Sequence, residues 1–226
     1  MIALARFQVS GYVRSLRVLQ PVIVILLILA LVLFQPPANA ELAAGAFGDV
    51  AAFMFPVWAW AARALLDTQP DEQRALSATA ARHPLTPACA GLLAAYAVNL
   101  ALGAAILAVP TVQGLSAGLD GTALAAGLGL NLLVAAAGTF LGAWTSRAVI
   151  PDAGVSLLAL LGGATAALLL SIGPLSWLSV PMVAWIRAAH DGPGEFVAAF
   201  PGLALHLGLW TAVVGVVYVV VRRGRP

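Results

Sequence analysis

The sequence contains no lysine, and charged residues of any kind are scarce. All 11 basic residues are arginine, and charged residues make up 9% of the 226-residue chain, against about 25% in ordinary soluble domains. Hydrophobic residues account for 62%. This composition predicts a polytopic membrane protein. Nucleic-acid binding is disfavoured, because no basic face remains outside the flanks of the apolar segments.

The absence of lysine also excludes a phosphate-binding loop of the Gly-x4-Gly-Lys-[Ser/Thr] type, which needs that cation. No cofactor is therefore expected in this chain, and ATP and Mg²⁺ would have to be bound by a partner subunit if the protein is ATP-driven. Cysteine is nearly absent as well. The single Cys89 excludes an intrachain disulfide and a cysteine-based metal site, and we interpret it as a small hydrophobe.

Long apolar runs are abundant. A hydrocarbon core of about 30 Å needs about 20 apolar residues per helix, so the chain can form six spans joined by short loops, with no separate soluble domain. The predicted fold is all-α, with a single membrane-spanning domain over residues 1–226. The six spans are predicted at residues 18–34, 45–66, 86–109, 122–144, 153–173 and 201–221.

The N-terminal residues 5–17 mix arginine with apolar side chains, which predicts an interfacial amphipathic helix that leads into the first span. A cleaved signal peptide has a similar basic start, and a small-residue processing site ending at Ala40 keeps this alternative open. The apolar run over residues 18–34 is longer than a typical signal core. A retained first span is therefore favoured.

The most polar segment covers residues 67–84. Thr68 followed by Asp71 is typical of a helix start, and the alanine-rich run that follows has high helix propensity, so a short helix ending before Pro84 is predicted. Such a helix cannot bury itself and needs a soluble partner or the lipid surface. We interpret it as a coupling helix that docks another molecule.

Arginine is divided unevenly between the two predicted faces of the membrane. Ten arginines lie on the face that holds both termini and residues 67–84, and only Arg187 lies on the other. By the positive-inside rule, this bias predicts a multi-pass protein of the cytoplasmic membrane with both termini cytoplasmic. Residues 174–200, on the outer face, contain pieces too short to cross and are predicted to form short re-entrant or interfacial helices.

This order of parts resembles the permease subunit of type-2 ATP-binding-cassette exporters. The resemblance covers nearly the whole chain: an N-terminal helix at 5–17, a polar loop at 67–84, a tight turn at 146–152, short outer helices at 174–200 and a basic tail. Family members often carry a glutamate followed by a Gly-Thr step in the polar loop. Here Glu72 is followed by Gln-Arg-Ala-Leu instead.

In that family the N-terminal helix and the loop after the second span contact a separate ATPase subunit, and spans one and five form the dimer seam. The resemblance therefore implies an ATPase partner, a second permease copy or paralogue, and export of a hydrophobic or amphipathic substrate such as a lipid, drug or peptide. The implied ATPase-docking residues are Asp71, Glu72, Arg74, Arg82, His83 and Arg14.

Two asparagines lie near the middle of predicted spans. Asn99 and Asn131 must find a partner in protein or in a wet cavity at that depth. Hydrogen bonding between helices is the first interpretation, and lining a substrate path is the second. His206 in the last span is a further candidate for that path. No acidic residue lies deep in a span, which disfavours a proton-relay carrier.

Glycines at four-residue spacing predict close helix packing. Gly138 and Gly142 form such a face on the fourth span, and Gly162 with Gly163 would let the fifth span approach another helix. These faces are common in membrane bundles and indicate no particular function.

Two patterns are typical of hydrolases. Residues 114–118 match Gly-x-Ser-x-Gly, but that motif needs a strand-to-helix elbow, and we interpret the match as a turn. Six spans and His206 invite comparison with rhomboid intramembrane proteases, a remote alternative because the fourth span contains no serine. The main alternative function is a carrier independent of ATP or an assembly factor. No enzymatic activity is expected in this chain.

Overall fold

The computed structural model describes residues 1–70, 73, 83 and 85–223, and these residues are mostly helical with no strand among them. The elements in chain order are α1 (Ile2–Arg14), α2 (Leu19–Leu31), α3 (Ala40–Leu66), α5 (Thr86–Ser116), α6 (Gly121–Trp144), α7 (Ala153–Ile172), η1 (Ser176–Leu178), α8 (Met182–His190) and α9 (Pro193–Arg223). The predicted all-α class is confirmed. The predicted coupling helix lies largely outside the described residues.

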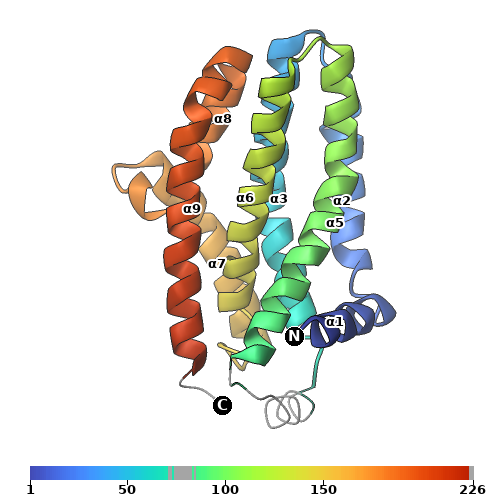
Figure 1. Ribbon diagram of the computed structural model, residues 1–226, viewed down its shortest axis with the longest axis vertical. Helices are drawn as coiled ribbons and strands as arrows, with labels where there is room; N and C mark the ends of the chain where they lie inside the picture. Colours follow the sequence, from blue (N-terminus) through green and yellow to red (C-terminus); the bar gives the residue numbers. More distant parts are fainter. Residues whose placement is uncertain (71–72, 74–82, 84, 224–226) are drawn as a thin grey trace.

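Within the described ranges, five helices are long and apolar enough to cross a membrane: α3, α5, α6, α7 and α9. They run along the long axis of the molecule (Figure 1), with α3 the most buried and α7 and α9 the most exposed. Helix α3 packs against α5, α6, α7 and α8. This architecture is that of a polytopic membrane protein, as predicted.

The first predicted span, at residues 18–34, is wrong in its extent. Helix α2 has 13 residues, which reach about 20 Å at 1.5 Å per residue, less than a hydrocarbon core of about 30 Å. The helix ends at Leu31, five residues before Pro36. Helices α1 and α2 together are apolar enough for one span, broken by a bend of 71°.

The predicted N-terminal helix at residues 5–17 is α1, which begins at Ile2, ends at Arg14 and lies across one end of the bundle (Figure 1). The bend after it includes Leu16, whose φ of 58° is in the left-handed region that side chains with a Cβ rarely adopt. Backbone hydrogen bonds on both sides of Leu16 hold this conformation. The position of α1 at a lipid interface stays a prediction.

Two helices continue through prolines at which the sequence analysis places boundaries. Helix α5 passes Pro110 and ends at Ser116, so the predicted end at residue 109 is wrong. Helix α9 begins at Pro193 and contains Pro201, so the predicted start at residue 201 is also wrong. A proline removes one backbone hydrogen bond, which a long packed membrane helix tolerates. The short outer helices of the described chain are therefore η1 and α8, and residues 193–200 belong to α9.

Side-chain caps fix other helix starts. Asn39 Oδ1 accepts the backbone N–H of Leu42 at 2.9 Å, so α3 begins earlier than the predicted span at 45–66. Asp120 and Asp152 cap α6 and α7 in the same way. These two helices consequently match the predicted spans to within one residue at each end.

The Gly-x-Ser-x-Gly match at residues 114–118 is the C-terminal turn of α5. Gly118 has a φ of 80°, and the backbone N–H of Leu119 donates to the carbonyl of Gly114 at 2.9 Å. This is the Schellman pattern that closes a helix with a left-handed glycine. The interpretation of the motif as a turn is confirmed.

Helices α3 and α6 touch through glycine. A Cβ added at Gly142 would overlap the carbonyl oxygen of Ala59, and one at Gly138 would lie 3.0 Å from the carbonyl oxygen of Phe55. The two backbones are therefore in direct contact, as the spacing of these glycines predicts. On α7, a Cβ added at Gly163 would lie 2.9 Å from Leu141 Cδ1 of α6, so the approach predicted for Gly162 and Gly163 is made at Gly163, whereas Gly162 has no atom within 4 Å.

The features that carry most of the arginines gather at one end of the bundle. Helix α1, the C-terminal end of α3, the turn between α6 and α7 and the C-terminal end of α9 lie at this end, which we call the basic end (Figure 1). Helix α8, with Arg187, and the connection between α5 and α6 lie at the opposite end. Which end faces the cytoplasm stays a prediction.

Replacing Gly142 with alanine is expected to lower the free energy of unfolding by about 1–3 kcal/mol, because the added methyl group overpacks a backbone contact that cannot yield. Gly162→Ala is the matched control, since its methyl group meets no atom within 4 Å. Thermal unfolding in detergent measures both. Equal stability of the two variants would contradict the contact between α3 and α6.

Cysteine accessibility tests the orientation. Ser15 and Ser116 are exposed at opposite ends of the bundle, so each can be replaced by cysteine in a Cys89→Ala background. If the basic end is cytoplasmic, an impermeant thiol reagent added to intact cells labels Ser116→Cys and spares Ser15→Cys until the cells are opened. The reverse pattern would overturn the orientation.

Candidate functional site

The side chain of Arg63 joins α3 to the start of α7 at the basic end. Its Nε donates to Ser156 Oγ at 2.6 Å, and one terminal nitrogen donates to the carbonyl of Ala153 at 3.1 Å. Arg63 also lies 3.7 Å from the carboxylate of Asp67, and the two side chains are only 12% and 9% exposed. The Ser156 hydroxyl in turn donates to the carbonyl of Thr145. One arginine thus connects α3, α7 and the end of α6.

Asp67 extends this assembly toward α1. Its Oδ1 accepts the backbone N–H of Arg147 at 2.7 Å, and its carbonyl oxygen accepts a hydrogen bond from Arg17 at 3.1 Å. Gln8 of α1 donates to Gln69 at 3.4 Å. The residues that lead from α3 into the 67–84 segment are therefore bonded both to the N-terminal part of the chain and to the turn between α6 and α7.

Helix α9 joins the same assembly. A terminal nitrogen of Arg222 donates to the carbonyl of Ala148 at 3.0 Å. Together, these contacts tie α1, the C-terminal end of α3, the turn between α6 and α7 and the end of α9 into one polar assembly.

The predicted docking residues are placed only in part. Arg14 is exposed in the last turn of α1, and His83 is exposed, with its Nδ1 accepting the backbone N–H of Leu85 at 3.3 Å. Asp71, Glu72, Arg74 and Arg82 lie outside the described residues.

The middle of the bundle holds the two asparagines, both essentially unexposed. Asn99 Nδ2 donates to the carbonyl of Trp58 at 3.1 Å and to Thr139 Oγ1 at 2.9 Å. Asn131 Nδ2 donates to the carbonyl of Phe47 at 3.1 Å, and to a carbonyl of its own helix at 2.9 Å. The prediction that these amides join helices is confirmed, and their role in a substrate path stays a prediction.

A groove of about 510 Å³ lies beside these amides. We call it the α5–α6 groove, because its walls are α5 from Asn99 to Val112 and α6 from Leu128 to Ala135, with Trp58 of α3 contributing as well. Among the described residues that line it, none is charged. Three residues of this lining each hold a buried polar atom that has no hydrogen-bond partner within the described chain: Asn99 Oδ1, Asn131 Oδ1 and Trp58 Nε1.

Trp58 is a residue whose role sequence reasoning misses. Beside Trp60 and Arg63 it is typical of an interfacial aromatic belt, yet its side chain is fully buried. A Cβ added at Gly103 of α5 would lie 3.9 Å from Trp58 Nε1. Buried indole N–H groups usually have a hydrogen-bond partner. The unpaired Nε1 of Trp58 therefore singles this residue out as a candidate for ligand binding.

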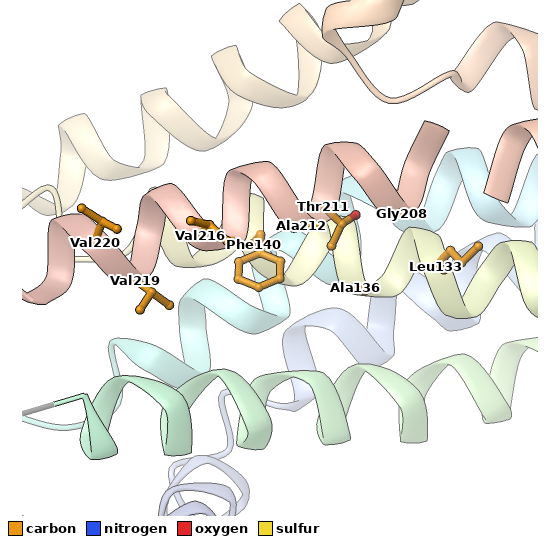
Figure 2. A pocket seen from close by; sticks show the side chains of 10 residues that line it. Leu133, Ala136, Phe140, Gly208, Thr211, Ala212, Val216, Val219 and Val220 are labelled. Atoms are coloured by element: carbon orange, nitrogen blue, oxygen red, sulfur yellow. The ribbon is translucent and has the colours of Figure 1, made fainter. Parts of the chain in front are cut away.

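A second groove, of about 600 Å³, runs along the packed pair of helices α6 and α9 (Figure 2). Leu133, Ala136 and Phe140 of α6 face residues of α9 that are apolar apart from Thr211. His206 is half-buried on α9, its Nε2 has no partner among the described residues, and it lines neither groove. The structure therefore does not bring His206 together with Asn99 and Asn131.

The end of the bundle opposite the basic end carries a hydrogen-bonded histidine–aspartate pair. His190 Nε2 lies 2.9 Å from Asp49 Oδ1, and both side chains are partly exposed, at 46% and 32%. The His190 ring packs over Gly45, where an added Cβ would lie 2.9 Å from it. In the described ranges no group of three or more His, Cys, Asp and Glu side chains is placed to hold a metal ion.

Replacing Arg63 with lysine is expected to destabilise the protein by about 1.5–3 kcal/mol, the range for hydrogen bonds to charged groups. A lysine cannot donate in two directions from a planar fork, so Ser156 and the Ala153 carbonyl cannot both keep their partner. Arg223→Lys, at the exposed end of α9, is the control. Thermal unfolding that is equally unchanged in both variants would contradict the role of Arg63 in joining α3 to α7.

Comparison with protein-family models, with curated proteins and with solved structures gives no match to this chain. Its role must therefore be inferred from its own geometry. That geometry consists of a bonded assembly at the basic end and an apolar groove with three unpaired polar atoms at mid-bundle.

Proposed function

We propose that this chain is the permease subunit of an exporter of the type-2 ATP-binding-cassette kind, driven by a separate ATPase that docks at the basic end. The observation that carries the proposal is the polar assembly around Arg63 and Asp67. It joins α1 and the start of the 67–84 segment, the two parts that contact the ATPase in the resembled family, to the ends of α3, α6 and α7.

This assembly gives a route by which a push at one end can move the helices. A load applied to α1 or to residues 67–84 acts on Asp67 and Arg63 at the end of α3. Because α3 contacts seven other helices and is bonded to the turn between α6 and α7, the load is shared by the bundle instead of bending one loop. Rigid-body motion of packed helices is a common form of such transitions.

The order of parts supports the same proposal. A helix lies across the basic end, a bent connection leads into α2, and two short helices, η1 and α8, precede the last long helix. ATP and Mg²⁺ would be held by the ATPase subunit, because the phosphate loop and its lysine are missing from this sequence.

The proposal includes a second permease copy or paralogue against α2 and α7, the spans that form the dimer seam in the resembled family. Both helices present apolar side chains outward, including Leu26 and Leu27 on α2 and Leu158 and Leu161 on α7. In a monomer, lipid would cover these apolar faces. The mass of the purified complex therefore distinguishes a monomer from a dimer.

The intact complex, purified from its native membrane in mild detergent, is expected to contain two permease chains and two ATPase subunits, as its mass would show. In Glu72→Arg the recovery of ATPase should fall, because losing one partner of an interfacial charge pair costs roughly 2–5 kcal/mol. Glu195→Arg, exposed at the end opposite the basic end, is the matched charge reversal and should leave recovery unchanged.

If Glu72 acts only in docking, thermal unfolding of Glu72→Arg should match that of the unmodified protein, since surface charges contribute about 0–1 kcal/mol to stability. Normal ATPase recovery in Glu72→Arg would remove this residue from the docking site. A complex that contains no ATPase at all would contradict the proposed function and favour a carrier or an assembly factor.

A further inference from the structure

We propose that the α5–α6 groove is a binding site for an elongated, uncharged lipid that carries a hydroxyl or amide group. The groove's own lining carries this inference. The further step, that the bound lipid is the exported cargo, rests on the proposed permease function.

The orientation of both amides is fixed by their partners. The Thr139 hydroxyl donates to the carbonyl of Ala135 at 2.7 Å, so its oxygen is left to accept from Asn99 Nδ2. Asn131 Nδ2 likewise faces two carbonyls. Turning either amide over would point its oxygen at a carbonyl oxygen, so Asn99 and Asn131 each keep an unpaired acceptor. Trp58 Nε1 supplies an unpaired donor.

A buried polar atom without a partner costs about 1–3 kcal/mol, and three of them lie in the lining of one groove. A hydroxyl or an amide both donates and accepts, so it can satisfy an asparagine oxygen and the indole N–H of Trp58. An alkane does neither. An ether or ketone can only accept, which serves the indole and leaves both amide oxygens unpaired.

The charge and depth of the groove exclude ionised groups. Both asparagines lie near the middle of long apolar helices, and no charged side chain contributes to the lining in the described chain. An ion at this depth without a counter-charge is unfavourable by at least several kcal/mol. A phosphate, carboxylate or ammonium head is therefore disfavoured, and an uncharged amphiphile is the class that fits.

The spacing of the polar atoms sets the shape of the ligand. Asn99 is bonded to the carbonyl of Trp58 and Asn131 to that of Phe47, carbonyls that lie roughly 16 Å apart along α3 at 1.5 Å per residue. Gly103, beside the Trp58 indole, is one helical turn from Asn99. The lipid's polar group therefore binds by Trp58 and Asn99, and its hydrocarbon chain follows the groove in the direction of Asn131.

The groove has room for this group. An added Cβ at Gly103 would make ordinary contacts with the indole, 3.6 Å from Trp58 Cζ2 and 3.9 Å from Nε1. A side chain placed at Gly103 therefore occupies the space proposed for the ligand without displacing a backbone. Ala104, exposed at the edge of the groove, offers a second position from which to fill it.

The test uses the full-length chain in phosphatidylcholine vesicles and two photoactivatable probes. One is hexadecanol with a diazirine in its chain, and the other is hexadecane with the same diazirine. After illumination, mass spectrometry locates the adducts. The alcohol should label α5 from Asn99 to Val112 and α6 from Leu128 to Ala135 about three- to tenfold more than the alkane does, the factor expected of one net hydrogen bond.

Gly103→Val should reduce alcohol labelling of the groove to the level seen elsewhere on the lipid-facing surface. Gly162→Val, with no neighbour near its side chain, is the control and should label as the unmodified protein does. Ala104→Leu repeats the block from an exposed position, so the test does not depend on one variant folding. Trp58→Phe removes the indole donor but not the Asn99 acceptor, so it should lower alcohol labelling toward the alkane level while leaving alkane labelling unchanged.

Equal labelling by alcohol and alkane would mean that the groove holds only bulk lipid chains, and would overturn the proposal. Alcohol labelling that persists in both Gly103→Val and Ala104→Leu would also overturn it. No ATPase is needed for this measurement. The groove can therefore fail as a lipid site while the permease proposal stands, and the reverse also holds.

Discussion

Direct contact between the backbones of α3 and α6 is the constraint on which the rest of the bundle depends. Gly138 and Gly142 let α6 lie against α3 with no side chain between them. Only at this separation does Asn131 of α6 reach the carbonyl of Phe47, and only then can Asn99 of α5 bond to α3 and to α6 at once. The glycine contact and the amide bonds are therefore mutually dependent: the first sets the distance, and the second fixes the register of three helices.

The same small side chains that allow close packing also leave space. Helix α6 is pressed against α3 on one side, and its other sides face helices whose contact residues include Gly103 and Ala104 on α5 and Gly208 and Ala212 on α9. Residues of this size cannot fill the gap between helices. Two grooves therefore flank α6. The lining residues toward α9 hold one unpaired polar atom in the described chain, Thr211 Oγ1, whereas those toward α5 hold one unpaired donor, from α3, and two unpaired acceptors, from α5 and α6.

Hydropathy predicts most of the long helices, because a long apolar run indicates a membrane-spanning segment whatever it packs against. Helix ends are predicted less well. Prolines such as Pro110 and Pro201 usually mark the end of a helix in a soluble protein, but the packed helices α5 and α9 continue through them. Among the site residues, the sequence identifies Asn99 and Asn131, because they are polar residues in the middle of apolar spans. It does not identify Trp58, since α3 is apolar on nearly all sides and its sequence does not show which face is buried. The Asp49 and His190 pair joins residues 141 positions apart, which no local pattern can indicate.

The bond between Arg63 and Ser156 has a consequence for how the protein is made. The two residues are 93 positions apart, and chains grow at roughly 5–20 residues per second. The guanidinium of α3 therefore reaches the membrane roughly 5–20 s before its partners on α7 have been synthesised. During that interval its only partner in this assembly is Asp67, four residues later, and the rest of its hydrogen bonds go to water and lipid headgroups. A long basic side chain in that position anchors the end of its helix at the headgroups and prevents the segment from sliding deeper. If the basic end lies at the bilayer surface, the residue that later joins α3 to α7 would also anchor α3 at the headgroups while the rest of the bundle is inserted.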